Sequence, residues 1–87
     1  MAFFTARILS KDGIAITEDI EVWMHFFRHG HVEMWAGSCE VPVTTPLTQR
    51  TYRLQLTDGR AGRMTAIVTQ LRGENLAVYF EGKGALG

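Results

Sequence analysis

The 87-residue chain has one cysteine, two prolines and no long hydrophobic run. Because Cys39 has no partner for a disulfide within the chain, the fold has to be held by core packing, and a reducing compartment such as the cytoplasm is expected. No apolar stretch approaches the roughly 20 residues of a transmembrane helix. The first residues lack the basic and apolar segments of a signal peptide. We therefore predict a cytoplasmic protein that does not bind membranes.

A net charge is also missing, since nine basic side chains balance nine acidic ones. This balance removes overall charge as an argument for binding to nucleic acid or to an anionic membrane. The charges are nevertheless divided along the chain, because residues 1–43 hold three basic and six acidic side chains and residues 44–87 hold six and three. The division favours contact between unlike halves, either within one barrel or between two copies.

Sequence motifs of several enzyme classes are absent as well. The chain has no glycine-rich phosphate loop, no Gly-x-Ser-x-Gly nucleophile elbow and no cysteine or histidine spacing typical of zinc sites. Glu40 beside Cys39 disfavours a thiolate, so we expect an inert, half-buried thiol. We predict a non-enzymatic protein that needs no cofactor.

Apolar and polar residues alternate with a period of two along most of the chain, and no segment has the apolar stripe of a helix. Runs rich in β-branched and aromatic residues, separated by glycine turns, predict strands at about 2–10, 14–17, 19–28, 31–38, 50–57, 60–71 and 76–82. The second run is short and can merge with the third. Pro42 and Pro46 argue against a central strand at 39–49, which we interpret as a covering loop. The length allows a single domain, residues 1–87.

Glycine turns predict how these strands pair. Three of them have the same form, with the glycine at Gly13, Gly30 and Gly59. A three-residue loop ending in a glycine bulge separates apolar from polar faces better than a two-residue turn at each position. At the third turn this register pairs Tyr52 with Met64 and Arg53 with Arg63.

At the last hairpin, matching the faces requires an odd-numbered loop around residues 72–74. Val68 then pairs with Val78, and Ala66 pairs with Phe80. The result is an all-β antiparallel meander of six or seven strands with one apolar face, which has to be covered. Closure into a small barrel or roll, SH3-like or OB-like, covers that face and removes the sheet edges.

The outward face of the 19–38 hairpin carries large aromatic residues. The expected cross-strand pairs are Trp23 with Trp35, His25 with Glu33, and Phe27 with His31. Three aromatic rings on an outer face need cover, either from the 39–49 loop, from a second copy of the chain, or from a ligand or peptide. Since tryptophan and phenylalanine are favoured interface anchors, we predict a binding module that forms a homo-oligomer or binds another protein through Trp23, Phe27, Trp35, His25 and Glu33.

Two alternatives rest on other residues. Arg53 and Arg63 on one sheet face indicate a weak nucleic-acid or anion binder, unless Glu81 neutralises them. His25 and Glu33 indicate a small-ligand barrel or an enzyme. With His31 they also have the composition of an open metal site, although a surface hydrogen bond is the ordinary explanation.

A resemblance to a known group rests on two segments, 52–62 (YRLQLTDGRAG) and 78–86 (VYFEGKGAL). They resemble the C-terminal half of small uncharacterised bacterial β-barrel proteins, some of which are carried on mobile gene cassettes. The resemblance covers less than half of the chain and rests on turn residues. It implies a bacterial β-barrel and assigns no functional residue.

Overall fold

The structure is a computed structural model and describes residues 2–84, 86 and 87. Its six strands are β1 (Ala2–Leu9), β2 (Ile20–His29), β3 (Val32–Pro42), β4 (Thr51–Leu56), β5 (Ala61–Arg72) and β6 (Asn75–Lys83). The all-β prediction is confirmed, and the described residues form no helix that is long and apolar enough to cross a membrane.

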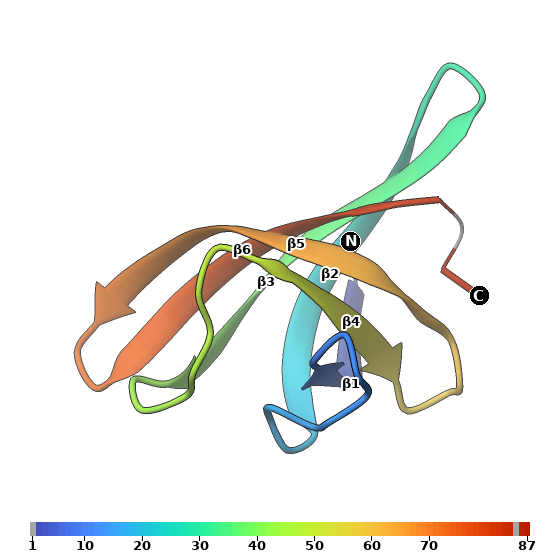
Figure 1. Ribbon diagram of the computed structural model, residues 1–87. Helices are drawn as coiled ribbons and strands as arrows, with labels where there is room; N and C mark the ends of the chain where they lie inside the picture. The colour runs from blue at the N-terminus through green and yellow to red at the C-terminus, as the bar shows by residue number, and fades with distance from the viewer. Residues whose placement is uncertain (1, 85) are drawn as a thin grey trace.

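All six strands belong to one closed antiparallel barrel with the order β1-β2-β3-β6-β5-β4 (Figure 1). The predicted meander exists within each half of the chain, β1-β2-β3 and β4-β5-β6. Between the halves, however, β3 pairs with β6 rather than with β4, and β4 pairs with β1. The small barrel predicted from the sequence is thus confirmed. Its two halves are joined by two strand pairs, the seams β3–β6 and β1–β4.

The predicted strand at 14–17 is wrong, although the turn before it is as expected. Ser10 N–H donates to the Ile14 carbonyl at 2.8 Å, and Leu9 bridges Ala15. The Thr17 hydroxyl then accepts a hydrogen bond from Ile8 N–H at 3.0 Å, which ends the pairing. Strand β1 therefore pairs with β2 itself.

The hairpin at Gly30 has a different register from the predicted one. His29 pairs with Val32, so the turn has two residues, and Gly30 holds its first position at a φ of 65°. This conformation is readily accessible to glycine and is the one that such a turn requires. Trp23 consequently pairs with Ser38, and Trp35 pairs with Phe26. The two tryptophans lie on opposite faces of the hairpin.

The predicted register of the β5–β6 hairpin is correct in one part and wrong in another. Arg72 pairs with Asn75 in a two-residue turn, and Val68 pairs with Tyr79 instead of Val78. A bulge between Ala66 and Val68 then absorbs one residue, so that Ala66 pairs with Phe80 as predicted. The hairpin at Gly59 follows the predicted register throughout.

The proposed loop at 39–49 is shorter than predicted, because β3 continues to Pro42. Pro42 is tolerated there since it is the last residue of the strand, opposite Asn75. The remaining loop residues 43–50 connect β3 with β4, and Leu47 from this loop is buried in the core. The loop therefore contributes to the barrel interior.

Trp35 is the largest fully buried side chain of that interior. Its ring lies against the backbone of Gly82 and close to Gly62, and it meets Phe80 edge to face at 6.1 Å between ring centroids. A Cβ atom at Gly82 would overlap the indole ring. Two glycines on neighbouring strands thus make room for one tryptophan.

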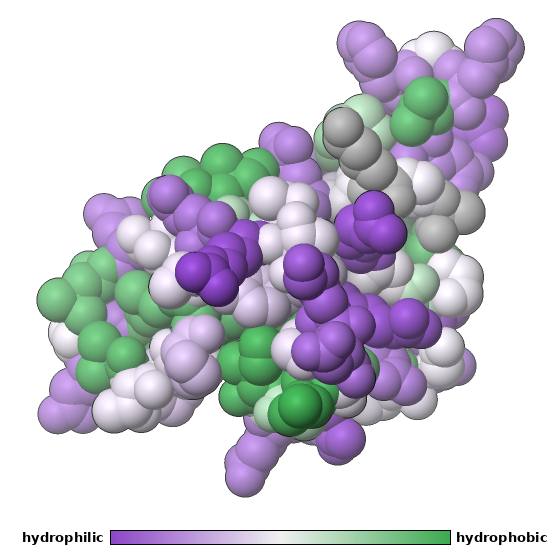
Figure 2. Space-filling model, in the orientation of Figure 1, coloured by the Kyte–Doolittle hydropathy of each residue, from purple (hydrophilic) through white to green (hydrophobic). Residues whose placement is uncertain are grey.

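The β2–β3 hairpin extends beyond the barrel and makes the molecule elongated, with extents of 39 × 23 × 22 Å (Figure 1 and Figure 2). The pairing of β1 with β2 ends at Met24, and the pairing of β3 with β6 ends at Met34. Residues 25–33, which we call the arm, therefore continue as a two-stranded ribbon.

We expect the substitution Gly82→Ala to lower the free energy of unfolding by about 3 kcal/mol, the upper part of the range for overpacked cores, because the added Cβ would overlap the rigid, fully buried ring of Trp35. Urea denaturation followed by circular dichroism measures this loss. Gly62→Ala is the comparison and should cost less, since its added Cβ would meet the flexible end of the Leu86 side chain and would approach the Trp35 ring only to 3.0 Å. Equal losses in the two variants would contradict this account of the core.

Candidate functional site

The outer surface of the barrel carries a continuous row of side chains across five strands, which we call the aromatic row. Its members, each paired with the next, are Phe3, Trp23, Ser38, Tyr79 and Val68. Val22 and Val78 are fully buried, so the alternation of side chains along a strand places their neighbours Trp23 and Tyr79 on the outside, and cross-strand partners share that face. The row exists because β1 pairs directly with β2.

Two features of the aromatic row favour binding. Phe3 is 59% exposed and Tyr79 is 42% exposed, which leaves large apolar surfaces in contact with solvent. Phe3 packs on Trp23 with 4.0 Å between ring centroids. The small side chain of Ser38 lies between Trp23 and Tyr79. It lines a groove of about 630 Å³, together with Glu21 and other neighbours. The surface is thus apolar and hollowed.

Acidic side chains border the aromatic row on the side away from the arm. Glu21 and Glu40 line the groove, and Arg72 forms a 3.5 Å ion pair with Glu40. On the side toward the arm, His25 stacks on Phe27 with 5.3 Å between ring centroids. The outer face of β2 is therefore acidic at its start and aromatic along its length.

The structure separates the predicted aromatic site into two groups. Trp23, His25 and Phe27 share the outer face, as predicted. Trp35 lies in the core, and Glu33 lies on the other face of the arm, where it pairs with Arg28 at 3.1 Å. The reason is the two-residue turn at Gly30, because it gives every residue of β2 a different cross-strand partner on β3 from the predicted one.

Sequence reasoning missed three members of the aromatic row. The sequence pattern assigns no role to Phe3 or Ser38, and it does not place Tyr79 beside Trp23. Tyr79 had a usable signal, since it lies between the apolar residues Val78 and Phe80 and alternation places it outside. Phe3 had none, because its pairing with Trp23 joins strands that the Gly13 turn does not connect directly.

The hypothesis of catalysis or metal binding by His25 and Glu33 loses its geometric basis. These residues lie on opposite faces of the hairpin, and His25 pairs with Ala36. Within the described part of the chain, no three histidine, cysteine or carboxylate side chains are grouped as metal ligands would be.

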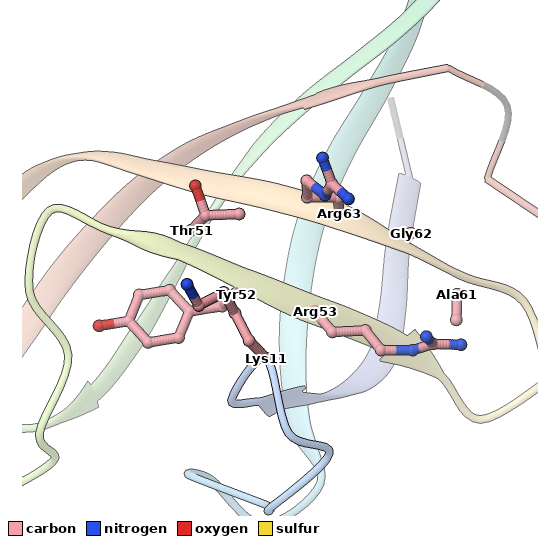
Figure 3. Close-up of a pocket in the computed structure, with 7 residues that line it drawn as sticks. All are labelled: Lys11, Thr51, Tyr52, Arg53, Ala61, Gly62 and Arg63. Carbon is pink, nitrogen blue, oxygen red and sulfur yellow. The ribbon is translucent and has the colours of Figure 1, made fainter.

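The basic site is arranged as predicted. Arg53 pairs with Arg63 across β4 and β5, and Lys11 from the β1–β2 loop joins them around a pocket of about 640 Å³ (Figure 3). Glu81 lies opposite Thr65, the predicted position. Among the described residues, however, no ion pair joins it to Arg63.

Cys39 lies on the inner face of β3 and is buried. Burial raises the pKa of its thiol from 9.0 to about 12, because the thiolate would lose its hydration. The thiol is therefore protonated over the whole physiological range. The prediction of an inert thiol agrees with this environment, although the side chain is more buried than expected.

We expect the thiol of the native protein at pH 8 to react with a disulfide reagent about a thousandfold more slowly than the same thiol in denaturing urea, since a pKa shift from 9.0 to about 12 lowers the thiolate fraction by that factor. Absorbance during labelling measures both rates. Similar rates in the two solutions would contradict the burial of Cys39.

Comparisons of this chain with protein-family models, with curated proteins and with solved structures find no match. The resemblance to bacterial cassette-encoded proteins therefore stays a prediction.

Proposed function

We propose that this protein is a non-enzymatic interaction module that associates with a second copy of itself through the outer face of β2 and β3. The observation that carries the proposal is the order of side chains along that face. Read from the barrel toward the arm, the outward residues of β2 are Glu21, Trp23, His25, Phe27 and His29.

This order is complementary to its own reverse. When two copies pack face to face with β2 strands antiparallel, Glu21 of one copy faces His29 of the other, and Trp23 faces Phe27. His25 faces its counterpart at the two-fold axis. An acid thus meets a hydrogen-bond donor, and an aromatic ring meets an aromatic ring, at both ends of the contact. A two-fold interface requires this kind of self-complementary surface.

Side-chain sizes on β3 support the same arrangement. Met34 pairs with Phe27 and Ser38 pairs with Trp23, so the reversal places Met34 of one copy over Ser38 of the other. Ser38 belongs to the hollow between Trp23 and Tyr79, and the flexible methionine side chain suits an irregular cavity. Ala36 lies at the axis, where a small residue permits close approach. A protruding residue and a hollow are therefore matched.

The length of the face is adequate for a stable contact. Strand β2 has ten residues and spans ~33 Å at about 3.3 Å per residue. The arm carries this face beyond the barrel, where Phe27 is 39% exposed. Stable interfaces are built around aromatic residues at their centre, and the reversal buries Trp23 and Phe27 of both copies.

We expect light scattering coupled to gel filtration to give a mass about twice the 9.8 kDa of one chain. Phe27→Ser should raise the dimer dissociation constant at least tenfold, because it removes a central aromatic ring from both halves of the interface. Phe26→Ser is the matched control. Its side chain is 48% exposed on the opposite face of the same strand, so the dimer should persist.

A monomer at 100 µM would overturn the proposal, and so would equal weakening by the two substitutions. Circular dichroism establishes that both variants are folded. A monomer that binds an apolar peptide through the aromatic row would identify a different partner for this face.

A further inference from the structure

We infer that the pocket formed by Lys11, Arg53 and Arg63 is a binding site for a small phosphate-bearing anion. This site lies on β4, β5 and the β1–β2 loop, apart from the face that we propose for self-association, and does not depend on that proposal.

The charges of this pocket are unbalanced, whereas four of the seven arginines of the chain form ion pairs with carboxylates. The arginine–carboxylate pairs are Arg7 with Asp19, Arg28 with Glu33, Arg60 with Asp58 and Arg72 with Glu40. Among the described residues, no ion pair involves Lys11, Arg53 or Arg63. Moreover, Arg53 and Arg63 are direct cross-strand partners, an arrangement in which like charges repel. A bound anion would remove this repulsion.

The geometry leaves room for such an anion. Figure 3 shows that Arg53 and Arg63 leave neighbouring strands and point their guanidinium groups apart, with Lys11 rising from the loop below. Gly62 and Ala61 line the pocket with little or no side chain, and its volume is about 640 Å³. The cationic groups end long, flexible side chains that can turn toward a bound anion.

The kind of anion follows from what surrounds the cations. Guanidinium groups bind phosphate through two parallel hydrogen bonds, and the polar residue Thr51 lines the same pocket. Single-stranded nucleic acid requires exposed aromatic rings beside the cations, on which its bases stack. Here Tyr52 is buried and its hydroxyl accepts a hydrogen bond from Thr48 N–H, whereas Phe3, Trp23 and Tyr79 belong to the aromatic row on other strands. A small phosphate compound therefore fits better than a polynucleotide.

The experiment uses inorganic pyrophosphate as the probe, in isothermal titration calorimetry and thermal unfolding at constant ionic strength. We expect saturable binding and an upward shift of the melting temperature. The double substitution Arg53→Gln, Arg63→Gln should weaken binding at least tenfold. Without pyrophosphate, the same variant should be as stable as the parent protein or more stable, because the repulsion is gone.

The matched control is Arg50→Gln, which removes a nearby positive charge that does not line this pocket. It should change pyrophosphate affinity less than twofold. Failure of the parent protein to bind pyrophosphate would overturn the inference, as would equal weakening by the control and the double variant. A 15-nucleotide single strand that binds more than tenfold tighter than pyrophosphate, and that loses affinity in the double variant, would also overturn it in favour of nucleic-acid binding.

Discussion

The two-residue turn at Gly30 determines which tryptophan fills the barrel and which faces solvent. With this turn, Trp35 points inward, and it fits only because Gly82 and Gly62 bring bare backbone against its ring. Trp23 then points outward and can pair with Phe3 and Ser38. The packed core and the exposed aromatic row are thus two results of one chain reversal.

The barrel divides its outer surface between two chemistries. The aromatic row, with acidic residues beside it, crosses β1, β2, β3 and β6 and ends at Val68 on β5, whereas Arg53 and Arg63 lie on β4 and at the start of β5. This division corresponds to the charge asymmetry between the two halves of the sequence. Closure through β3–β6 and β1–β4 holds the halves side by side, so that a neutral protein presents faces of different character.

Part of this structure could be predicted from the sequence, and the reason differs from hairpin to hairpin. At Gly59, polar Arg53 and Arg63 alternate with apolar neighbours, so only one register keeps arginine out of the core, and that register is found. At Gly30, both faces of the hairpin carry large apolar side chains, so alternation does not distinguish Trp23 from Trp35. The predicted aromatic site was therefore correct for Trp23, His25 and Phe27 and wrong for Trp35 and Glu33.

Non-local pairing accounts for most of what the sequence did not reveal. Phe3 reaches Trp23 only after the chain passes through the Gly13 turn and a further loop, and Tyr79 joins them from the other half of the chain. No turn residue encodes such contacts. The bulge after Ala66 likewise depends on the fit of β5 to β6, which alternation along one strand does not specify.

The crossing from β3 to β4 has a consequence for how the protein folds. Each half can form its two hairpins through contacts close in sequence, but neither half covers its apolar face until residues 34–42 meet 75–83 and residues 6–9 meet 53–56. Such distant pairings lose much chain entropy before they contribute stability, and they slow folding to the millisecond-to-second range typical of β-barrels. Until the β3–β6 and β1–β4 pairs form, strand edges stay unpaired and the apolar faces stay uncovered, so a newly synthesised chain is most prone to aggregation in that period.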